Sequence, residues 1–509
     1  MASAPLLPIA AMMIGGIVLA DFSADVLSQR VWFLGFAVAL LAAGGWRRRP
    51  LASSACQLVG VMMFGGWMMS RSQEIFPLPK SPITYEAVMT SEPSVHGKVV
   101  TGDLLITSGP LAGRRLKAAV LRDTLTRRYE SLRAGCGMQV RSRLEIPHDF
   151  HRGNFNYSRW LTTHGFVART FILSSAWRAH KVSFRKLSAT DRLRLKALAM
   201  RHSVLLRFET QGLGEKAYAL VAAMAIGDRS MLPKEVKTVF SQSGASHVLA
   251  LSGLHLGVIY FFLTFCFRHY RRRLWQQSLL LTVVWGYVFV AGLPVSATRA
   301  ATLLTIYAFV DLTDRSRSPL NTLSLAALVM LVGNPLLVWD VSFQMSMASV
   351  LGILLFYRPF YFLFGKEWMK KHRIMASVWS MAVVSLSAQI AVAPLVAYYF
   401  ELFSTWFLLS NFVAVPLTTA IIFTTIVLLL TTPVTAMQQV VVTVLDVLSS
   451  LLVGGLEFIS KLPLATIAPI RINATQTVLC YLFVGIVAAL VLLVRKEIKR
   501  RQHLKEIPF

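Results

Sequence analysis

The segment Gly244-Ala245-Ser246-His247-Val248-Leu249-Ala250-Leu251-Ser252-Gly253-Leu254-His255-Leu256-Gly257 opens an apolar run that continues to Phe267. Two histidines, two serines and three glycines occur here, where a bilayer-spanning helix would normally be apolar. Ionisable and small polar residues are costly at membrane depth, so they usually mark a pathway or a site. We therefore expect the function of the chain to depend on this segment.

The composition indicates a membrane protein with a strong positive charge. The chain has 509 residues, 55% hydrophobic and 15% charged, and its mean hydropathy is +0.58. A soluble protein of this length carries more charge, so we expect a polytopic membrane protein with room for a soluble domain. The net charge of +28 indicates an anionic partner, either phospholipid head groups or nucleic acid.

Windows of about 20 apolar residues predict twelve membrane spans, three before a less hydrophobic region at 71–210 and nine after it. The predicted spans are residues 5–20, 31–45, 53–70, 247–267, 276–293, 295–312, 319–333, 337–357, 374–400, 404–431, 435–459 and 475–494. The predicted domains are a three-span segment (1–70), a soluble domain (71–187), amphipathic linker helices (188–246), a second membrane domain (247–494) and a basic tail (495–509).

The soluble domain shows the alternation of half-buried β-strands. One face would carry Met138, Val140, Leu144 and Ile146, and the other Gln139, Arg141, Arg143 and Glu145. Similar short runs occur at residues 83–89, 97–107, 116–121 and 165–173, separated by Gly and Pro. We expect a small β-barrel or sandwich, and after it an interfacial helix that returns the chain to the membrane.

Short basic clusters predict the orientation of the chain. They are Arg47–Arg49, Arg268 with Arg271–Arg273, Lys370 with Lys371 and Arg373, and Arg495 with Lys496, Arg500 and Arg501. With twelve spans and a cytoplasmic N-terminus, all four clusters fall on the cytoplasmic side, as the positive-inside rule expects. The β domain would then lie outside and the C-terminus in the cytoplasm.

Residues 71–210 contain 24 Lys and Arg against 10 Asp and Glu, and their second half interleaves basic with aromatic residues. Single-stranded nucleic acid is bound in this way, because cations follow the phosphates and aromatic faces stack on bases. For any single aromatic residue a place in the core is the more ordinary interpretation, but the collective charge favours binding. The candidate DNA-binding residues are Arg141, Arg143, Arg152, Phe155, Tyr157, Arg159, Trp160, Arg169, Trp177 and Arg178.

Polar residues in the second membrane domain predict the lining of a path. Ser252 and His255 would share one helix face, with His247 close to it, inside a Gly253-x-x-x-Gly257 packing pattern. A hydrogen-bonded packing core explains these residues equally well. Arg299 and Asp340 could form a buried, structural ion pair, while Asp228, Arg229 and Glu235 precede the histidine segment and could gate its mouth. The candidate path residues are Ser246, His247, Ser252, His255, Arg299, Asp340, Gln344, Gln389 and Asn411.

Some motifs do not occur in the sequence. It contains no GxxxxGK[ST] loop for nucleotide hydrolysis, no HExxH and no histidine or aspartate cluster with metal spacing. We therefore expect no metal, no cofactor and no enzymatic activity.

Together these residues resemble the ComEC family of competence proteins, inner-membrane channels for DNA uptake, from about residue 25 to 430. The strongest matches are Gly227-Asp228-Arg229, Gly244-Ala245-Ser246-His247 and Leu251-Ser252-Gly253-Leu254-His255. Supporting matches are Gly292-Leu293-Pro294 with Arg299-Ala300, Asn334-Pro335, Ser342-Phe343-Gln344-Met345-Ser346 and Asn411 with Val415-Pro416. Gly153-Asn154-Phe155-Asn156-Tyr157 resembles the turn of the family's outer domain, although Asn156 stands where the family often has Asp.

The resemblance implies an OB-like domain outside the bacterial cytoplasmic membrane, a channel domain at 247–494, and single-stranded DNA as cargo beside membrane lipid. It also implies an outer-face DNA receptor and a cytoplasmic ATP-driven motor as partners. Many members carry a C-terminal metallo-β-lactamase-like domain, which this sequence lacks. We therefore expect no nuclease activity in this chain, and a separate nuclease is a possible partner.

Two other functions stay open on the sequence alone. An intramembrane serine hydrolase could pair Ser246 or Ser252 with a histidine, although this leaves the positive charge of the β domain unexplained. A transporter of an anionic lipid or polymer is the second alternative.

Overall fold

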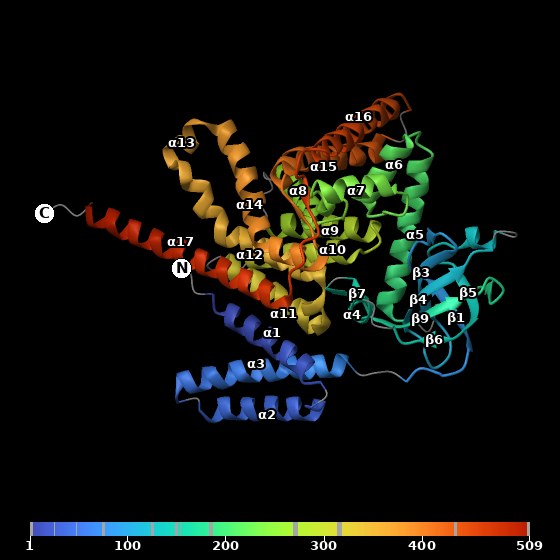
Figure 1. Ribbon diagram of the computed structural model, residues 1–509, viewed down its shortest axis with the longest axis horizontal. Helices are drawn as coiled ribbons and strands as arrows, with labels where there is room; N and C mark the ends of the chain where they lie inside the picture. The colour runs from blue at the N-terminus through green and yellow to red at the C-terminus, as the bar shows by residue number, and fades with distance from the viewer. Residues whose placement is uncertain are drawn as a thin grey trace.

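The computed structural model describes all residues except 1–3, 25, 47, 74–76, 124–126, 148–150, 153, 183–186, 268–272, 313–317, 432–434 and 506–509. It contains an N-terminal helical unit, a small mixed β-sheet domain and a larger helical domain (Figure 1). The predicted class, a mostly helical chain with several apolar spans and an inserted β domain, is confirmed at this level.

The N-terminal unit consists of α1 (Leu6–Phe22), α2 (Gln29–Gly45) and α3 (Pro50–Ser72), with α3 packed against both other helices. Glycines allow α1 and α3 to approach closely. A Cβ atom on Gly16 would overlap the carbonyl oxygen of Met62, and one on Gly65 would overlap that of Met13. Small residues at such contacts let membrane helices pack backbone against backbone.

The β domain is built on one eight-stranded sheet with the order β10-β5-β1-β3-β4-β9-β6, and β2 pairs with β3. Its strands are β1 (Ile83–Met89), β2 (Ser94–His96), β3 (Val99–Ile106), β4 (Arg115–Leu121), β5 (Gly137–Ser142), β6 (Leu144–Glu145), β9 (Phe166–Ile172) and β10 (Trp177–Ala179). The 3-10 helix η1 (Arg128–Ser131) precedes β5, and β7 (His151–Arg152) pairs with β8 (Phe155–Asn156). The pair β4–β9 is parallel, and the other pairs in the sheet are antiparallel.

The predicted alternation is confirmed along β5 and at Leu144, but it is wrong at Ile146, which is 62% exposed. Met138 and Val140 are fully buried, whereas Gln139 and Arg141 are exposed. β5 pairs with β1, and its continuation β6 pairs with β9. In the hydrogen-bonded order of the sheet, β10 and β6 are the two end strands, and a closed OB-like barrel stays a prediction.

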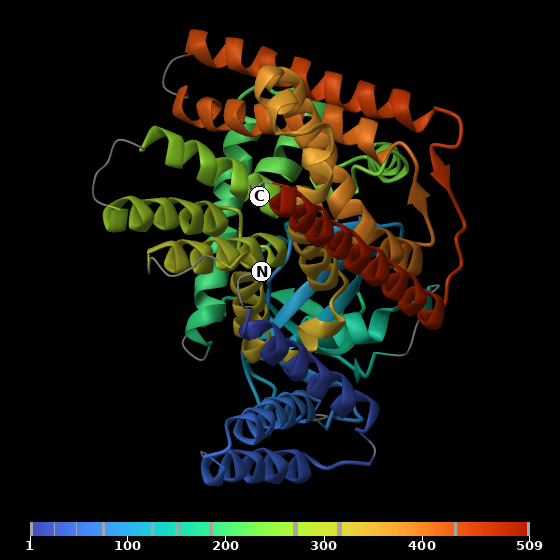
Figure 2. The same ribbon diagram turned by 90° about the vertical axis from the view of Figure 1, so that its left-hand side faces the viewer.

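Two helices connect the sheet to the rest of the molecule. α4 (Tyr157–Thr163) lies between β8 and β9. α5 (Ala189–Glu209) packs Leu195 on the sheet residues Val88 and Leu105, and buries Phe208 in the helical core. It stands upright in both views, while α9, α10, α15 and α16 run across them (Figures 1 and 2).

The helical domain follows α5. Its elements are α6 (Glu215–Val221), η3 (Ala222–Ile226), α7 (Lys234–Gln242), η4 (Ser246–Val248), α8 (Gly253–Cys266), α9 (Arg273–Val290), α10 (Val295–Leu312), α11 (Pro319–Gly333), η5 (Pro335–Trp339), α12 (Val341–Tyr361), η6 (Phe362–Phe364), α13 (Lys366–Lys371), α14 (Arg373–Phe400), α15 (Phe407–Thr431), α16 (Thr435–Ser460) and α17 (Ala474–Lys505). The short strands β11 (Phe403–Ser404) and β12 (Thr466–Ile467) pair before α15 and α17.

Each predicted span overlaps an apolar helix, but the helices differ in length and not every span is one continuous helix. In the described part of the chain, seven are long and apolar enough to cross a membrane: α3, α10, α12, α14, α15, α16 and α17. The apolar segments of α1, α2, α8, α9 and α11 are shorter, with 10–17 described residues each. The count of twelve spans therefore stays a prediction.

The described parts of the basic loops and the β domain lie at opposite ends of the molecule in Figure 1. The α2–α3 turn, α13 and the C-terminal end of α17 are at the left of Figure 1, and the β domain is at the right. Part of the first basic cluster and most of the second fall on Arg47 and residues 268–272, which lie outside the described residues. The arrangement agrees with the predicted orientation, which stays a prediction.

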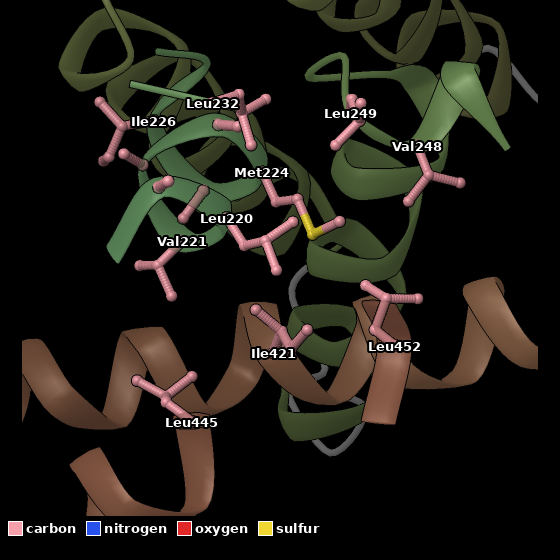
Figure 3. Close-up of a cluster of buried hydrophobic side chains, with 14 of the residues drawn as sticks. Leu220, Val221, Met224, Ile226, Leu232, Val248, Leu249, Ile421, Leu445 and Leu452 are labelled. Carbon is pink, nitrogen blue, oxygen red and sulfur yellow. The ribbon is translucent and has the colours of Figure 1, made fainter. Parts of the chain in front are cut away.

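The largest hydrophobic core joins the linker helices to the second membrane domain. Leu220, Val221 and Met224 of α6 and η3 lie opposite Ile421 of α15 and Leu445 of α16 (Figure 3). η3 is a π-helical turn, which ends at Gly227 with φ +78°. Such turns are frequent at functional sites. The predicted linker 188–246 is therefore part of the core of the helical domain.

We predict that Gly16→Ala lowers the thermal unfolding midpoint of the detergent-solubilised protein, because its methyl group would overlap the α3 backbone. Overpacking of this kind costs about 1–3 kcal/mol. Gly15→Ala is the matched control, since nothing lies within 4 Å of its Cβ position. Equal midpoints for the two variants would contradict the close α1–α3 contact.

Candidate functional site

The histidine segment does not form one continuous helix. Ser246 and His247 belong to η4 and are exposed, Leu249–Leu251 are not helical, and α8 begins only at Gly253. The prediction that residues 247–267 form one span, with His247 near the face of Ser252 and His255, is therefore wrong. The reason is that Ser252 is the N-cap of α8, so the helix cannot extend back to His247.

Ser252 and His255 form a capping box at the start of α8. The backbone N–H of Ser252 donates to Nδ1 of His255 at 2.9 Å, and Ser252 Oγ lies 3.1 Å from the same atom. Because Nδ1 accepts this bond, the proton of the neutral ring is on Nε2. His255 is 0% exposed, and its Nε2 has no hydrogen-bond partner among the described residues. The site thus contains a buried N–H donor without an acceptor.

Two side chains from other segments hold the non-helical backbone before α8, and a third holds the neighbouring π-helical turn. Arg229 Nε donates to the carbonyl of Leu249 at 3.0 Å, and Ser296 Oγ donates to that of Leu251 at 2.7 Å. Tyr287 OH donates to the carbonyl of Ala225 at 2.7 Å, in the adjacent π-helical turn. Non-helical backbone at membrane depth persists only where its polar groups are satisfied in this way or by water.

These contacts assign new roles to residues that the sequence left open. Arg229, which was expected to gate the mouth of the path, holds the non-helical segment Leu249–Leu251, the break before α8, and its side chain is still exposed. The neighbouring Asp228 is buried and pairs with Arg201 of α5 at 3.2 Å. The sequence reasoning missed Ser296 and Tyr287. Their signal was their position on either side of Gly292-Leu293-Pro294, a segment that matched the family.

The structure contains the predicted ion pair between Arg299 and Asp340, with a nitrogen–oxygen distance of 3.5 Å. Both residues are buried, and Arg299 Nη2 also donates to Ser342 Oγ at 2.7 Å. Asp340 caps α12 by accepting from the backbone N–H of Phe343 at 2.7 Å. Its other oxygen lies 3.5 Å from Nε2 of His164, at the end of α4. The pair therefore links α10, α12 and the β domain.

Five of the nine predicted path residues fall into two groups. Ser252 and His255 form the first, and Arg299, Asp340 and Gln344 form the second, where Gln344 Oε1 accepts from Tyr399 OH at 3.0 Å. α10 connects the two groups. It carries Arg299, and a Cβ atom added at Gly253 of α8 would lie 3.7 Å from the Cβ atom of the adjacent Ala300. The structure gives no contact that brings half-buried Gln389 or Asn411 to either group, although Asn411 Oδ1 is buried without a partner among the described residues.

Of the Gly253-x-x-x-Gly257 pattern, Gly253 faces Ala300 of α10, whereas Gly257 packs against no helix in the described part of the chain. A Cβ on Gly257 would meet nothing within 4 Å. The two glycines instead border an apolar groove of about 590 Å³ between α8 and α15. Its lining also includes Phe261, Phe262 and Phe423.

The candidate DNA-binding residues of the β domain occupy very different environments. Four arginines are exposed on its strands and loops: Arg141, Arg143, Arg169 and Arg178. Trp177 is only 3% exposed, so it belongs to the core and offers no face for stacking. Tyr157 and Trp160 stack on each other at 5.8 Å and, like Phe155, are half-buried. The side chain of Arg152 lies outside the described residues.

Arg159 joins the β domain to the membrane helices. It forms an ion pair with Asp21 of α1, and its guanidinium lies 3.8 Å from the ring centroid of Trp339. Two asparagines add hydrogen bonds. Asn334 Nδ2 donates to the carbonyl of Thr163 at 3.3 Å, and Asn154 Nδ2 donates to that of Ile472 at 2.7 Å. The α4 region is therefore a docking element, and Arg159 is not free for phosphate.

Comparison with known proteins places the second half of the chain in a known family. A family model described as competence protein matches residues 224–494, which is more than half of the chain. ComE operon protein 3 of Bacillus subtilis is 23% identical over 370 residues, covering 71% of this chain and 44% of that protein. Recombination protein 2 of Haemophilus influenzae is 26% identical over 278 residues, covering 52% of this chain and 33% of that protein. The chain thus spans less than half the length of these relatives. No solved structure matches it.

We predict that Arg159→Gln lowers the thermal unfolding midpoint, because it removes the contacts with Asp21 and Trp339, the latter worth about 0.5–2 kcal/mol. Arg178→Gln is the matched control on the same domain, since Arg178 is exposed. The measurement is unfolding followed by tryptophan fluorescence in detergent. A lower midpoint for Arg178→Gln than for Arg159→Gln would contradict the docking role.

Proposed function

The chain belongs to the competence protein family, and on this premise we propose that it carries single-stranded DNA across the bacterial cytoplasmic membrane during DNA uptake. The β domain would lie outside and receive the strand as an OB-like module. The strand would then pass the break before α8 and reach the cytoplasm, where the basic tail lies. A cytoplasmic ATP-driven motor would pull it, and an outer-face receptor would deliver it.

The observation that carries the proposal is the buried Nε2–H of His255 beside an interrupted span. A polar donor at this depth is costly unless it serves a pathway or finds an acceptor. Phosphate oxygens are strong acceptors, and fixed donors of this kind set selectivity for anions in other pores. Exposed Ser246, His247 and Arg229 at the mouth would supply further donors to the same strand.

The exposed arginines of the β domain support its role as the receiving surface. They share the sheet with the exposed aromatic Phe171, which is 52% exposed and lies two residues from Arg169 on β9. Backbone-directed cations next to aromatic faces favour binding of a single strand without sequence preference.

The hydrolase alternative loses its main support. Ser252 and His255, which would form its nucleophile–base pair, satisfy each other and the first turn of α8 as a helix cap. Nδ1 of His255 already accepts the backbone N–H of Ser252, so it is a poor base for the hydroxyl. The transport of an anionic lipid or polymer is not favoured by a specific contact.

Two substitutions of His255 separate its cap from its free donor. In His255→Asn, the side-chain oxygen takes the place of Nδ1 and keeps the cap, but the Nε2–H is lost. In His255→Gln, the side-chain N–H takes the place of Nε2, and the cap acceptor is lost. We expect His255→Asn to reduce DNA uptake tenfold or more without loss of thermal stability, since a hydrogen bond to a charged group contributes about 1.5–3 kcal/mol.

The measurement is the transfer of labelled DNA into the cytoplasm of a deletion strain that expresses each variant. His255→Gln should unfold at a lower temperature than the wild type, and it should retain more DNA uptake per folded molecule than His255→Asn. Normal uptake by His255→Asn would refute the role of the donor. If the deletion strain itself takes up DNA normally, the channel proposal fails.

A further inference from the structure

One exposed stripe of α5 carries three basic residues, two near its start and one near its end. It consists of Arg192, Lys196, Ala199, Ser203 and Arg207, all exposed, and we call it the α5 ridge. The spacing of four, three, four and four residues places them on one face of the helix. At 1.5 Å per residue, the ridge is about 22 Å long.

The opposite face of α5 is buried in the protein. Leu195 packs on the sheet, and Val204, Leu205 and Phe208 belong to the helical core. The acidic residue Asp191 is turned toward the sheet, where it pairs with Arg115 at 3.3 Å. Among the described residues, Arg192, Lys196 and Arg207 have no ion-pair partner, so three positive charges face outward without a neutralising carboxylate on the ridge.

The position of α5 is as informative as its charge. Its first turn is fixed to β4 by the Asp191–Arg115 pair, and its middle is fixed by Arg201 to Asp228. Asp228 is followed directly by Arg229, which holds the break before α8. The helix therefore extends from the sheet to the mouth of the candidate path (Figure 1).

We propose that the α5 ridge binds the phosphates of single-stranded DNA and guides the strand from the β domain to the break before α8. This rests on the proposed function and names a further contact surface for it. On the sheet, Lys117 of β4 and Arg169 of β9 are register neighbours, and Arg115 of β4 leads to the start of α5. Because Arg115 and Lys117 are paired with Asp191 and Asp103, the cations that lack an ion-pair partner among the described residues here are Arg169 on β9 and the three of the α5 ridge.

A lipid surface fits the ridge less well. A helix that lies in the membrane interface presents a contiguous apolar face with basic residues at its border. Here the exposed apolar residues Leu193, Met200 and Leu206 lie at the two edges, and the basic residues lie in the middle. The ridge itself carries no aromatic residue, so it would hold the strand by its backbone and not read its bases.

The test is binding of a labelled single strand to the full-length protein in nanodiscs of zwitterionic lipid, across a range of salt concentrations. The variant carries Arg192→Gln, Lys196→Gln and Arg207→Gln. The matched control carries Lys370→Gln, Lys371→Gln and Arg373→Gln, which remove the same charge from exposed residues far along the chain.

Each phosphate contact contributes about 0.7 to the slope of log K against log salt for single strands. We expect the ridge variant to lose about 2 units of slope, three times this value, and the control to keep the wild-type slope. Equal slopes for the two variants, with wild-type binding intact, would overturn the ridge and leave the proposed function standing. Absence of wild-type binding at low salt would count against the proposed function itself.

A lipid role would show in a second comparison. Hydrogen exchange of residues 189–209 is measured in nanodiscs with anionic or zwitterionic lipid, without DNA. Protection that depends on anionic lipid and on the three ridge cations, together with an unchanged DNA slope, would assign the ridge to lipid and overturn the proposal.

Discussion

The rest of the helical domain is arranged around one constraint, the need to satisfy backbone polar groups where the chain breaks before α8. A continuous helix would satisfy these groups internally, but the cap at Ser252 prevents it. Arg229 and Ser296 therefore bond the carbonyls of Leu249 and Leu251. These bonds require the π-helical turn, α8 and α10 to meet at one place, and they leave the Nε2–H of His255 as the one ring donor that the cap does not use. A polar interruption of this kind inside a membrane domain is what a hydrophilic substrate needs.

Two connections carry the β domain to this place. The α4 region docks through Arg159, His164 and neighbouring asparagines onto α1, η5 and α12. α5 fixes the sheet at one end and Asp228 at the other. Because Asp340 pairs with both Arg299 and His164, the docking of the β domain and the packing of α10 against α12 share one carboxylate. A β-sheet held in this way keeps a fixed position relative to the break.

The sequence was most informative where a periodic pattern met a strong physical preference. Alternation identified the strands of the sheet, and apolar windows identified the helices, because burial decides both. The Arg299–Asp340 pair was also foreseen, since two opposite charges in apolar spans need each other. The break at Leu249–Leu251 was not foreseen, because an apolar window gives the same score to a helix and to an interrupted helix. Arg159 and Trp177 looked like nucleic-acid ligands in sequence, yet one docks the domain and the other fills the core. Their neighbours in space, Asp21 and Trp339 for Arg159, are distant in sequence and leave no local signal.

The most direct test of the account is cross-linking of a stalled strand to the break before α8. A single strand with a thiol-reactive group on one phosphate is stalled during uptake by a bulky block at its trailing end. The protein carries Ser252→Cys, and the native Cys266, exposed at the far end of α8, is the internal control. The account predicts that the strand cross-links to position 252 and not to Cys266. Cross-linking to Cys266 alone, or to neither position while the strand is stalled, would contradict the claim that the DNA passes this break.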